Sequence, residues 1–390
     1  MDLQDKVLDK FMKQMNKGGD VIVPSSSPTS TLLRIPFGNT ILDVATGGGA
    51  PQGKIIRFYG PLSSGKTQNA LKIYAVNQHR CRFCWNTKET CTCGNKYRMF
   101  RLAFIDLENS WSPQWASSNG ILINEDPADP NILVSVPETG EQAMDIVDSL
   151  IRLRLANIII FDSVAQAVPS VELTKSIQDF AGGKVGAHSL VVNAAMRKWQ
   201  HGLNTRMEQY APLVVLINQV RETLDQYNPE TTPGGRGQGF ASALDIRFQR
   251  LKYRTDKGVT KGLAEFAPDK GSPVAQLQRF LVAKSKICPS GRVGEFWMWQ
   301  AKDGDRSPGD IVYGSSLFQY AKHFGVIVKQ AGEYIIVETG ETLGSKIDSA
   351  IEYLEKHPDT QNQVSEFIRE AAKDGKGRSS GLDESSEEDS

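Results

Sequence analysis

The sequence has no apolar run that approaches the ~18 unbroken residues of a membrane-spanning helix. It also lacks net charge, with 45 Lys and Arg against 45 Asp and Glu, and it shows no internal repeat. Its first residues, MDLQDKVLDKFMKQMNK, are amphipathic and mixed in charge, which is not typical of a secretory signal. We therefore expect a cytoplasmic protein with no membrane partner. A length of 390 residues allows one large domain with smaller appendages.

The absence of net charge conceals an uneven distribution of charged residues. Residues 246–292 carry eleven Lys and Arg against three acids, whereas the last twelve residues, SSGLDESSEEDS, carry five acids and no base. This pattern fits a DNA-binding face with an acidic tail, but it fits a solvated face with a solubilising tail equally well. Charge alone does not separate the two interpretations.

Short apolar runs alternate with helix-like stretches between about residues 31 and 300. Four of the runs are rich in Ile, Val, Leu and Phe without polar alternation, as expected of strands buried on both faces. They are Lys54–Tyr59, Leu102–Asp106, Asn157–Asp162 and Leu213–Ile217. Helices between such strands imply right-handed crossovers and an α/β fold with a mainly parallel central sheet. Ile246–Leu251, Phe280–Ala283 and Glu295–Trp299 could extend that sheet.

The chain divides into four predicted segments. Residues 1–30 contain an amphipathic helix at Leu3–Met15, a short strand at Asp20–Val23 and a Pro/Ser linker, and the helix needs a partner for its apolar stripe. Residues 31–303 form the α/β core. Residues 304–374 form a small α/β domain with helices over 347–358 and 363–373, and residues 375–390 form a disordered acidic tail.

A phosphate-binding loop is predicted at GPLSSGKT, which begins at Gly60 and fits G-x-x-x-x-G-K-[ST] between a strand and a helix. Glycines let backbone N–H groups turn toward phosphates, and the helix N-terminus adds favourable partial charge. Lys66 would neutralise the β- and γ-phosphates, and the Thr67 hydroxyl would bind Mg²⁺. Asp162, at the end of the run IIIFD, is the expected Mg²⁺ partner. The predicted nucleotide contacts of this segment are Gly60, Ser63, Ser64, Gly65, Lys66, Thr67 and Gln68.

Two polar residues at other strand ends are candidates for chemistry on the nucleotide. Glu108 follows the strand that ends at Asp106, where it could accept a proton from an attacking water; a helix-capping or solvated acid is the alternative. Gln219 ends the run LVVLINQ and precedes a polar, glycine-bearing loop. We expect Gln219 to sense a nucleotide phosphate and the loop to bind DNA, while a plain surface loop remains the alternative.

A cysteine-rich insertion at about residues 79–98 holds four of the five cysteines. Cys81, Cys84, Cys91 and Cys93 have the compact spacing C-x₂-C-x₆-C-x-C, and four thiolates can surround Zn²⁺. Such a site can fold a segment that is too small for a core. Free thiols in a loop, or His79 in place of one ligand, remain open, and a disulfide is disfavoured in a reducing compartment.

The motifs together resemble the RecA-type recombinases. They are GPLSSGKT at 60, AFIDLE at 103, ETGEQA at 138, IIIFDS at 158, AMRK at 195, LINQVR at 216 and NPETTPGG at 228, in the family's order over roughly residues 1–360. The resemblance implies a RecA-like ATPase core. It also implies an ATP-dependent filament on single-stranded DNA that pairs this strand with a homologous duplex and exchanges strands.

The resemblance also assigns roles to individual residues. It makes Glu108 the water-activating glutamate, Gln219 the γ-phosphate sensor and Trp115 the aromatic that stacks on adenine. Lys284 and Lys286 match a pair that reaches the ATP of a neighbouring subunit, which implies a nucleotide site between subunits. Ser112 and Leu62 stand where the family often has acids.

Two DNA-binding loops follow from the resemblance, at about residues 168–189 and 220–239. The expected contacts combine apolar or aromatic groups that insert between bases with cations and glycines that approach the phosphates, so that binding is largely independent of sequence. They are Val185, Arg197, Arg221, Leu224, Tyr227, Gly234 and Gly235. A RecA-fold ring motor or helicase, and an ATP-regulated mediator that binds DNA without exchange, are the alternative functions.

Overall fold

The computed structural model describes residues 10–14, 32–124, 126–174, 186–204, 211–222, 230–235, 237–259 and 271–373. Residues 10–14 are helical and lie inside the amphipathic segment predicted at Leu3–Met15. The predicted strand at Asp20–Val23, the Pro/Ser linker and the acidic tail lie outside the described residues.

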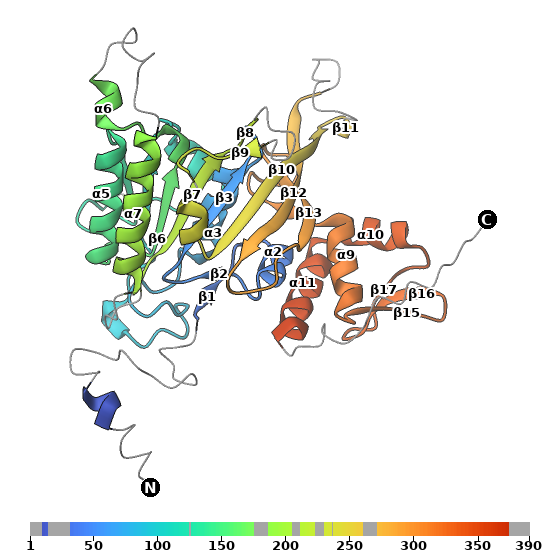
Figure 1. Cartoon of the computed structure of the whole chain (residues 1–390). Coiled ribbons are helices and arrows are strands. Elements are labelled where there is room, and N and C mark those ends of the chain that lie inside the picture. The colour runs from blue at the N-terminus through green and yellow to red at the C-terminus, as the bar shows by residue number, and fades with distance from the viewer. Residues whose placement is uncertain are drawn as a thin grey trace.

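Ten strands of the described ranges form one central sheet (Figure 1). They are β3 (Ile55–Gly60), β4 (Leu102–Asp106), β5 (Ile132–Ser135), β6 (Ile158–Asp162), β7 (Leu213–Gln219), β10 (Leu244–Thr255), β11 (Gly258–Val259), β12 (Pro273–Ser285), β13 (Val293–Trp299) and β14 (Ile311–Val312). The order is β14-β13-β12-β10-β3-β7-β6-β4-β5, with β11 paired to β10. Neighbours from β10 to β5 are parallel, whereas those from β10 to β14 are antiparallel. The α/β fold with a parallel core is therefore confirmed. Of the three predicted extensions, the one in β10 is parallel to β3, and those in β12 and β13 continue the sheet with antiparallel pairing.

Both faces of the inner parallel strands, β3, β7, β6 and β4, are buried. Because side chains alternate along a strand, Ile158 and Ile160 of β6 join one hydrophobic cluster, and Ile159 and Phe161 join the other. The first cluster includes α3 (Lys66–Asn77), and the second includes α5 (Gly140–Arg152) and α7 (Ala187–Asn204). Figure 1 shows α5 and α7 side by side on one face of the sheet. This burial on two faces explains the unbroken apolar runs of these strands.

The helices α5 and α7 are fixed by local signals and by one buried hydrogen bond. The side chain of Thr139 caps α5 by accepting a hydrogen bond from the backbone N–H of Gln142. Near the other end of α5, Arg152 pairs with Asp148 one turn earlier at 2.8 Å. The buried Trp199 of α7 packs in the core and donates from Nε1 to the carbonyl of Met144 at 3.1 Å, which joins the two helices.

The C-terminal elements form a smaller α/β unit beside the sheet. They are α9 (Gly314–His323), β15 (Ile327–Gln330), β16 (Glu333–Ile336), β17 (Thr342–Gly344), α10 (Ile347–Lys356) and α11 (Pro358–Lys373). The last two confirm the two helices predicted over 347–358 and 363–373, although α10 ends at Lys356 and α11 already begins at Pro358. Arg369 of α11 donates to the Thr40 hydroxyl at 2.7 Å and lies 3.6 Å from the Asp43 carboxylate, so it links this unit to the core. The strand β14 belongs to the central sheet, although its residues fall after position 304.

Short elements connect these parts. They are β1 (Arg34–Ile35), α2 (Thr40–Ala45), β2 (Ala50–Pro51), η2 (Gly94–Lys96), α4 (Pro113–Ser118), η3 (Val164–Gln166), α6 (Ser170–Leu173), β8 (Arg221–Glu222), β9 (Glu230–Thr231) and α8 (Gly237–Ala241). Among the helices of the described ranges, none combines the length and the apolar character that crossing a bilayer requires.

Candidate nucleotide site and associated loops

The predicted phosphate loop joins β3 to α3 at the carboxyl edge of the parallel strands. Gly60 has φ +151°, and a Cβ atom there would lie 2.1 Å from the carbonyl oxygen of Phe248. Gly65 has φ +83°, and its Cβ atom would lie 2.2 Å from the Gln278 side chain. Both positions therefore require glycine, for the backbone conformation and for the close approach of β10 and β12. The phosphate loop thus packs against β10 and β12 on one side and continues into α3.

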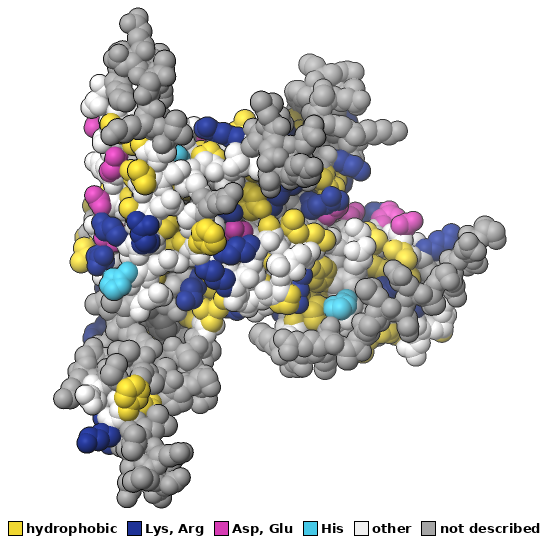
Figure 2. Space-filling view, in the orientation of Figure 1, with side chains coloured by type: hydrophobic (Ala, Val, Ile, Leu, Met, Phe, Trp, Pro, Cys, Tyr) yellow, Lys and Arg dark blue, Asp and Glu magenta, His cyan; other side chains and the backbone are white. Residues whose placement is uncertain are grey.

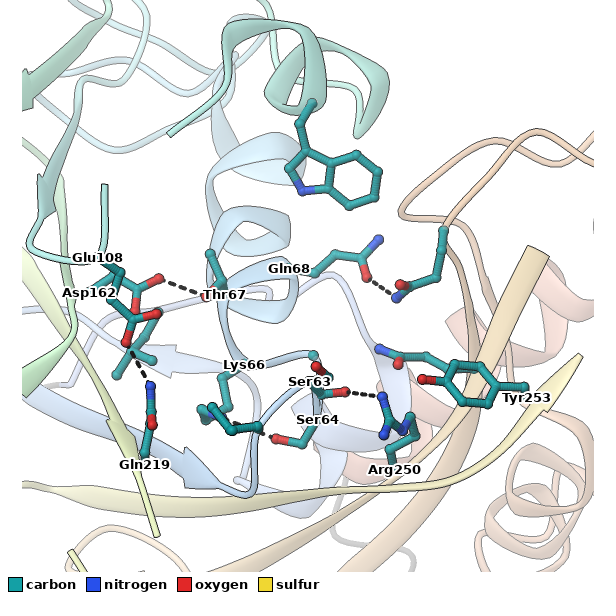
Figure 3. Close-up of a pocket in the computed structure, with 16 residues that line it drawn as sticks. Ser63, Ser64, Lys66, Thr67, Gln68, Glu108, Asp162, Gln219, Arg250 and Tyr253 are labelled. Carbon is teal, nitrogen blue, oxygen red and sulfur yellow. Dashed lines mark hydrogen bonds between the residues drawn. The ribbon is translucent and has the colours of Figure 1, made fainter. Parts of the chain in front are cut away.

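Lys66 and Thr67 begin α3, and the second Mg²⁺ candidate, Asp162, is the last residue of β6 (Figure 3). The Lys66 ammonium donates to the carbonyls of Gly60 at 3.1 Å and Pro61 at 2.6 Å, and burial lowers its pKa while Asp162 and Glu108 raise it. Thr67 donates from its hydroxyl to the Asp162 carboxylate at 2.7 Å. Burial raises the pKa of Asp162 to about 7, and the Thr67 hydrogen bond opposes that rise. A hydroxyl and a carboxylate this close are oxygen ligands of the kind that Mg²⁺ prefers.

Glu108 and Gln219 meet across the same cavity. Gln219 donates from Nε2 to Oε1 of Glu108 at 2.8 Å, and the Ser163 hydroxyl donates to the same oxygen at 2.5 Å. Asp106 holds the turn that carries Glu108, because its carboxylate accepts the backbone N–H groups of Ser110 and Trp111. Glu108 is thus a fixed, hydrogen-bonded carboxylate. The sequence analysis assigned no role to Ser163, although it lies within the motif IIIFDS.

A cavity of about 370 Å³ brings these residues together. All but one of the nucleotide contacts predicted within residues 60–68 line it, together with Glu108, Trp115, Asp162 and Gln219; the exception is Gly60, at the base of the loop. The lining side chains that were not predicted are Leu62, Ile217, Arg250, Tyr253, Gln276 and Gln300. Three of them come from β10 and β12, which reach the loop through their contacts with its two glycines, and no sequence motif marks these three residues.

The far side of the cavity combines an indole with amide groups. The hydroxyl of Ser112 accepts the backbone N–H of Trp115 at 3.2 Å and so caps α4, which gives a structural reason for serine there. Gln68 donates to the Asn119 side chain at 2.8 Å, and it accepts from Gln300 at 2.7 Å. The resulting surface suits a flat, polar heterocycle better than a hydrocarbon.

Comparison with known proteins identifies the family. A family model described as the RecA N-terminal domain matches residues 3–289. The chain belongs to the RecA family. It is 31% identical to Protein RecA of Frankia alni over 379 residues, which cover 94% of this chain and 92% of the relative. It is 30% identical to Protein RecA of Lactobacillus johnsonii over 381 residues, which cover 95% of this chain and 90% of that relative. It is 29% identical to Protein RecA of Nostoc sp. over 372 residues, which cover 93% of this chain and 87% of that relative.

The lysine pair that the RecA resemblance assigned to a neighbouring subunit lies at the end of β12 and just beyond it. Lys284 donates to the carbonyls of Gly239 and Ser242, the latter at 2.7 Å, and Lys286 donates to the carbonyl of Phe240. Burial lowers the pKa of Lys284, and the nearby Asp245 raises it. Neither lysine is among the described side chains that line this chain's own nucleotide cavity.

The stem of the second RecA-type loop is tied to the residue beside Gln219. The buried Asn218 donates from Nδ2 to the carbonyl of Pro233 and to Oε1 of Gln238, both at 2.9 Å. Gly234 is buried, and a Cβ atom there would lie 2.9 Å from Val164, so this glycine serves packing. A Cβ atom added at Gly235 would lie 3.0 Å from the hydroxyl oxygen of Ser189. Gly234 and Gly235 therefore bring the second loop close to η3 and to α7, the helix that follows the first predicted DNA loop.

The other predicted DNA contacts are partly described. Arg221 is exposed on β8, which pairs with β9 to close the base of the second loop. Arg197 is exposed on α7. Val185, Leu224 and Tyr227 lie outside the described residues.

The cysteine-rich insertion brings its four thiols together. The sulfur atoms of Cys81, Cys84, Cys91 and Cys93 all lie within 4.8 Å of one another. Four sulfurs at the usual Zn–S distance of about 2.3 Å around one ion would be about 3.8 Å apart, so the cluster fits a tetrahedral metal site. In the described residues His79 does not belong to this cluster. The buried Trp85 anchors the insertion on Phe100, with ring centroids 4.8 Å apart.

Proposed function

We propose that this member of the RecA family is an ATP-dependent DNA recombinase, which binds single-stranded DNA as a helical filament, pairs it with a homologous duplex and exchanges strands. The observation that carries the proposal is the hydrogen bond between Gln219 and Glu108 across the nucleotide cavity. It joins a candidate catalytic carboxylate to the strand end from which the second DNA loop begins. The same cavity thus holds the candidate residues for ATP hydrolysis and the strand end that leads into the second DNA loop.

ATP with Mg²⁺ is the proposed cofactor. The loop residues Ser63, Ser64 and Gly65 present backbone N–H groups to the phosphates, with Lys66 as the balancing cation. Thr67 and Asp162 would hold Mg²⁺, which supplies positive charge next to the phosphates when it is bound. Their shared hydrogen bond of 2.7 Å supports this role.

Glu108 is the proposed base that orients the attacking water and accepts its proton. The remaining pocket residues have binding roles: Trp115 stacks on the base, and Gln68 forms hydrogen bonds at the entrance of α3. Ser163 keeps the Glu108 carboxylate in position through its hydrogen bond of 2.5 Å. Lys66 and Gln219 complete the catalytic group because both face the reacting phosphate.

ATP would control DNA binding through the strand end at Asn218 and Gln219. A γ-phosphate that attracts the Gln219 amide competes with Glu108 for it, and Asn218 passes any shift of the strand to Pro233 and the loop stem. In the ATP-bound state, Arg221 and Gly235 contact the phosphate backbone of DNA, as does Arg197, while Val185, Leu224 and Tyr227 insert between bases or stack on them. Figure 2 shows Lys and Arg side chains across the middle of one face, between the α5–α7 side and the C-terminal elements.

Self-association is supported by the edge of the central sheet. The strand β5 ends the sheet order, so one of its edges has no neighbour among the described strands. Val134 of β5 and Val136 just beyond it are exposed, as are Leu153 and Leu155 between α5 and β6. A second copy could cover this apolar surface with the amphipathic Leu3–Met15 segment, and place Lys284 and Lys286 at a neighbour's ATP.

The thiol cluster is proposed as a structural zinc site. Zn²⁺ would join Cys81, which is buried, to the three partly exposed cysteines of the insertion. Such an ion supplies folding free energy to a short segment with few apolar contacts of its own. In the described part of the insertion, Trp85 is the only fully buried large side chain, which supports a need for metal.

Strand exchange between homologous DNA molecules with ATP and Mg²⁺ tests the proposed function directly. We expect exchange that requires both, and helical filaments by electron microscopy with single-stranded DNA and an ATP analogue. Rings together with DNA-stimulated hydrolysis but no exchange would instead indicate a motor. DNA binding with neither exchange nor DNA-stimulated hydrolysis would indicate a mediator.

A further inference from the structure

The nucleotide cavity has a second cation that no sequence motif indicates. Arg250 lies on β10, beyond the last residue of that strand that pairs with β3, and its side chain reaches the phosphate loop. Its Nη1 donates to the carbonyl of Ser63 at 3.3 Å. Its Nε is buried and has no hydrogen-bond partner among the described residues. A buried guanidinium nitrogen without an acceptor is costly, which points to an acceptor that arrives with the ligand.

Tyr253 holds this guanidinium toward the cavity. The Cζ atom of Arg250 lies 4.6 Å from the centroid of the Tyr253 ring, a cation–π contact between residues three apart on one strand. Both side chains line the nucleotide cavity. A planar guanidinium supported on a ring presents its N–H groups in a fixed plane, which matches phosphate oxygens better than a flexible ammonium does.

The charges that line the cavity also favour a role for Arg250 in binding an anionic ligand. In the part of the chain that the structure describes, its lining contains two acids, Glu108 and Asp162, and two bases, Lys66 and Arg250. Without Arg250 the acids would outnumber the bases in a cavity that must bind a polyanion. Mg²⁺ at Thr67 and Asp162 would neutralise one side of the phosphates. Figure 3 shows Arg250 beside Ser63 and Ser64, with Lys66 between it and the Asp162 side.

We propose that Arg250, supported by Tyr253, binds the terminal phosphate of ATP within the same subunit, on the side opposite the Mg²⁺ ligands. This proposal rests on the proposed function, because it assumes that the cavity binds ATP. Arg250 is then a specificity-determining residue that distinguishes ATP from ADP, and it adds a charge-assisted hydrogen bond in the subunit that hydrolyses the nucleotide. Its contact with Ser63 keeps it in place when no nucleotide is bound.

Calorimetric titration of the full-length protein with AMP-PNP and with ADP, both with Mg²⁺, tests the proposal. For Arg250→Gln we expect affinity for AMP-PNP to fall about tenfold or more, because one charge-assisted bond is lost. Affinity for ADP should change less than about twofold, since ADP lacks the phosphate that this residue contacts. Arg250→Lys should recover part of the AMP-PNP affinity, and Tyr253→Leu should lose part of it while Tyr253→Phe retains it.

The controls separate this proposal from a structural role and from the proposed function. Arg279→Gln removes an exposed arginine that pairs with Glu295 on the neighbouring strand, and it should bind both nucleotides normally. Equal losses for AMP-PNP and ADP in Arg250→Gln would overturn the proposal, because they would mean that the residue only shapes the loop. Unchanged binding of both would also overturn it. If Lys66→Ala also binds both nucleotides normally, the nucleotide site itself is wrong; if only Lys66→Ala is impaired, the failure is confined to Arg250.

Discussion

Replacement of Gln219 by Ala should uncouple nucleotide binding from DNA binding. Gln219 forms a 2.8 Å hydrogen bond to Glu108, and the neighbouring Asn218 holds the loop stem. A ligand shifts an equilibrium only by its differential interaction with the two states. The coupling that passes through Gln219 is therefore bounded by one hydrogen bond to a charged group, about 1.5–3 kcal/mol, or roughly 10- to 150-fold in affinity.

The measurement is fluorescence anisotropy of a labelled single-stranded oligonucleotide, with and without a non-hydrolysable ATP analogue. In the wild-type protein the analogue should tighten DNA binding. In Gln219→Ala this tightening should shrink by about tenfold, whereas affinity without nucleotide should stay within about twofold. Gln330→Ala, which removes an exposed glutamine of β15, is the matched control. If the analogue tightens binding equally in Gln219→Ala and in the wild type, the sensor role is refuted.

Three further predictions concern chemistry, metal and pH. Lys66→Ala should lower ATP turnover by on the order of 10²–10³, because a preorganised cation at the phosphates is lost, and normal turnover in a phosphate-release assay would contradict the site. Cys84→Ser should lower bound zinc, measured by plasma mass spectrometry, from about one ion per chain, while Cys288→Ser should not; zinc far below one ion per chain in the wild type would count against the site. Burial raises the pKa of Asp43 from 3.8 to about 7, so the folded state binds its proton more tightly and the free energy of unfolding falls as pH rises from about 4 to 7. Asp43→Asn should reduce that fall by up to about 1.4 kcal/mol per pH unit in urea titrations, and identical slopes for the two proteins would disprove the assignment.

The sequence predicted those parts of the fold that leave a local pattern. The strands β3, β4, β6 and β7 are buried on both faces, so their apolar runs are unmistakable, and the loop after β3 has a motif of its own. The edge strand β5 was not predicted because it is short and partly exposed, with Val134 open to solvent. The helix α9 was also missed, although the two helices that come after it in the C-terminal unit, α10 and α11, were predicted.

The candidate site was predicted where motif and strand end coincide. Asp162 and Gln219 are the last residues of parallel strands, Glu108 lies two residues beyond another, and parallel strands bring their carboxyl ends to one edge. Arg250 and Gln276 reach the same cavity from antiparallel strands far along the chain, so no spacing in the sequence relates them to the loop. Chain topology, not composition, determines their position.

The crowding around Gly60 and Gly65 limits how this protein can be re-engineered. Each loop glycine lies against a strand that is also bonded to its neighbours in the sheet, so added bulk at the loop would have to be accommodated by displacing β10 or β12. Attempts to alter nucleotide preference by mutating the loop alone should therefore yield misfolded protein more often than new specificity. Variants at the side chains those two strands extend into the cavity offer the more permissive route.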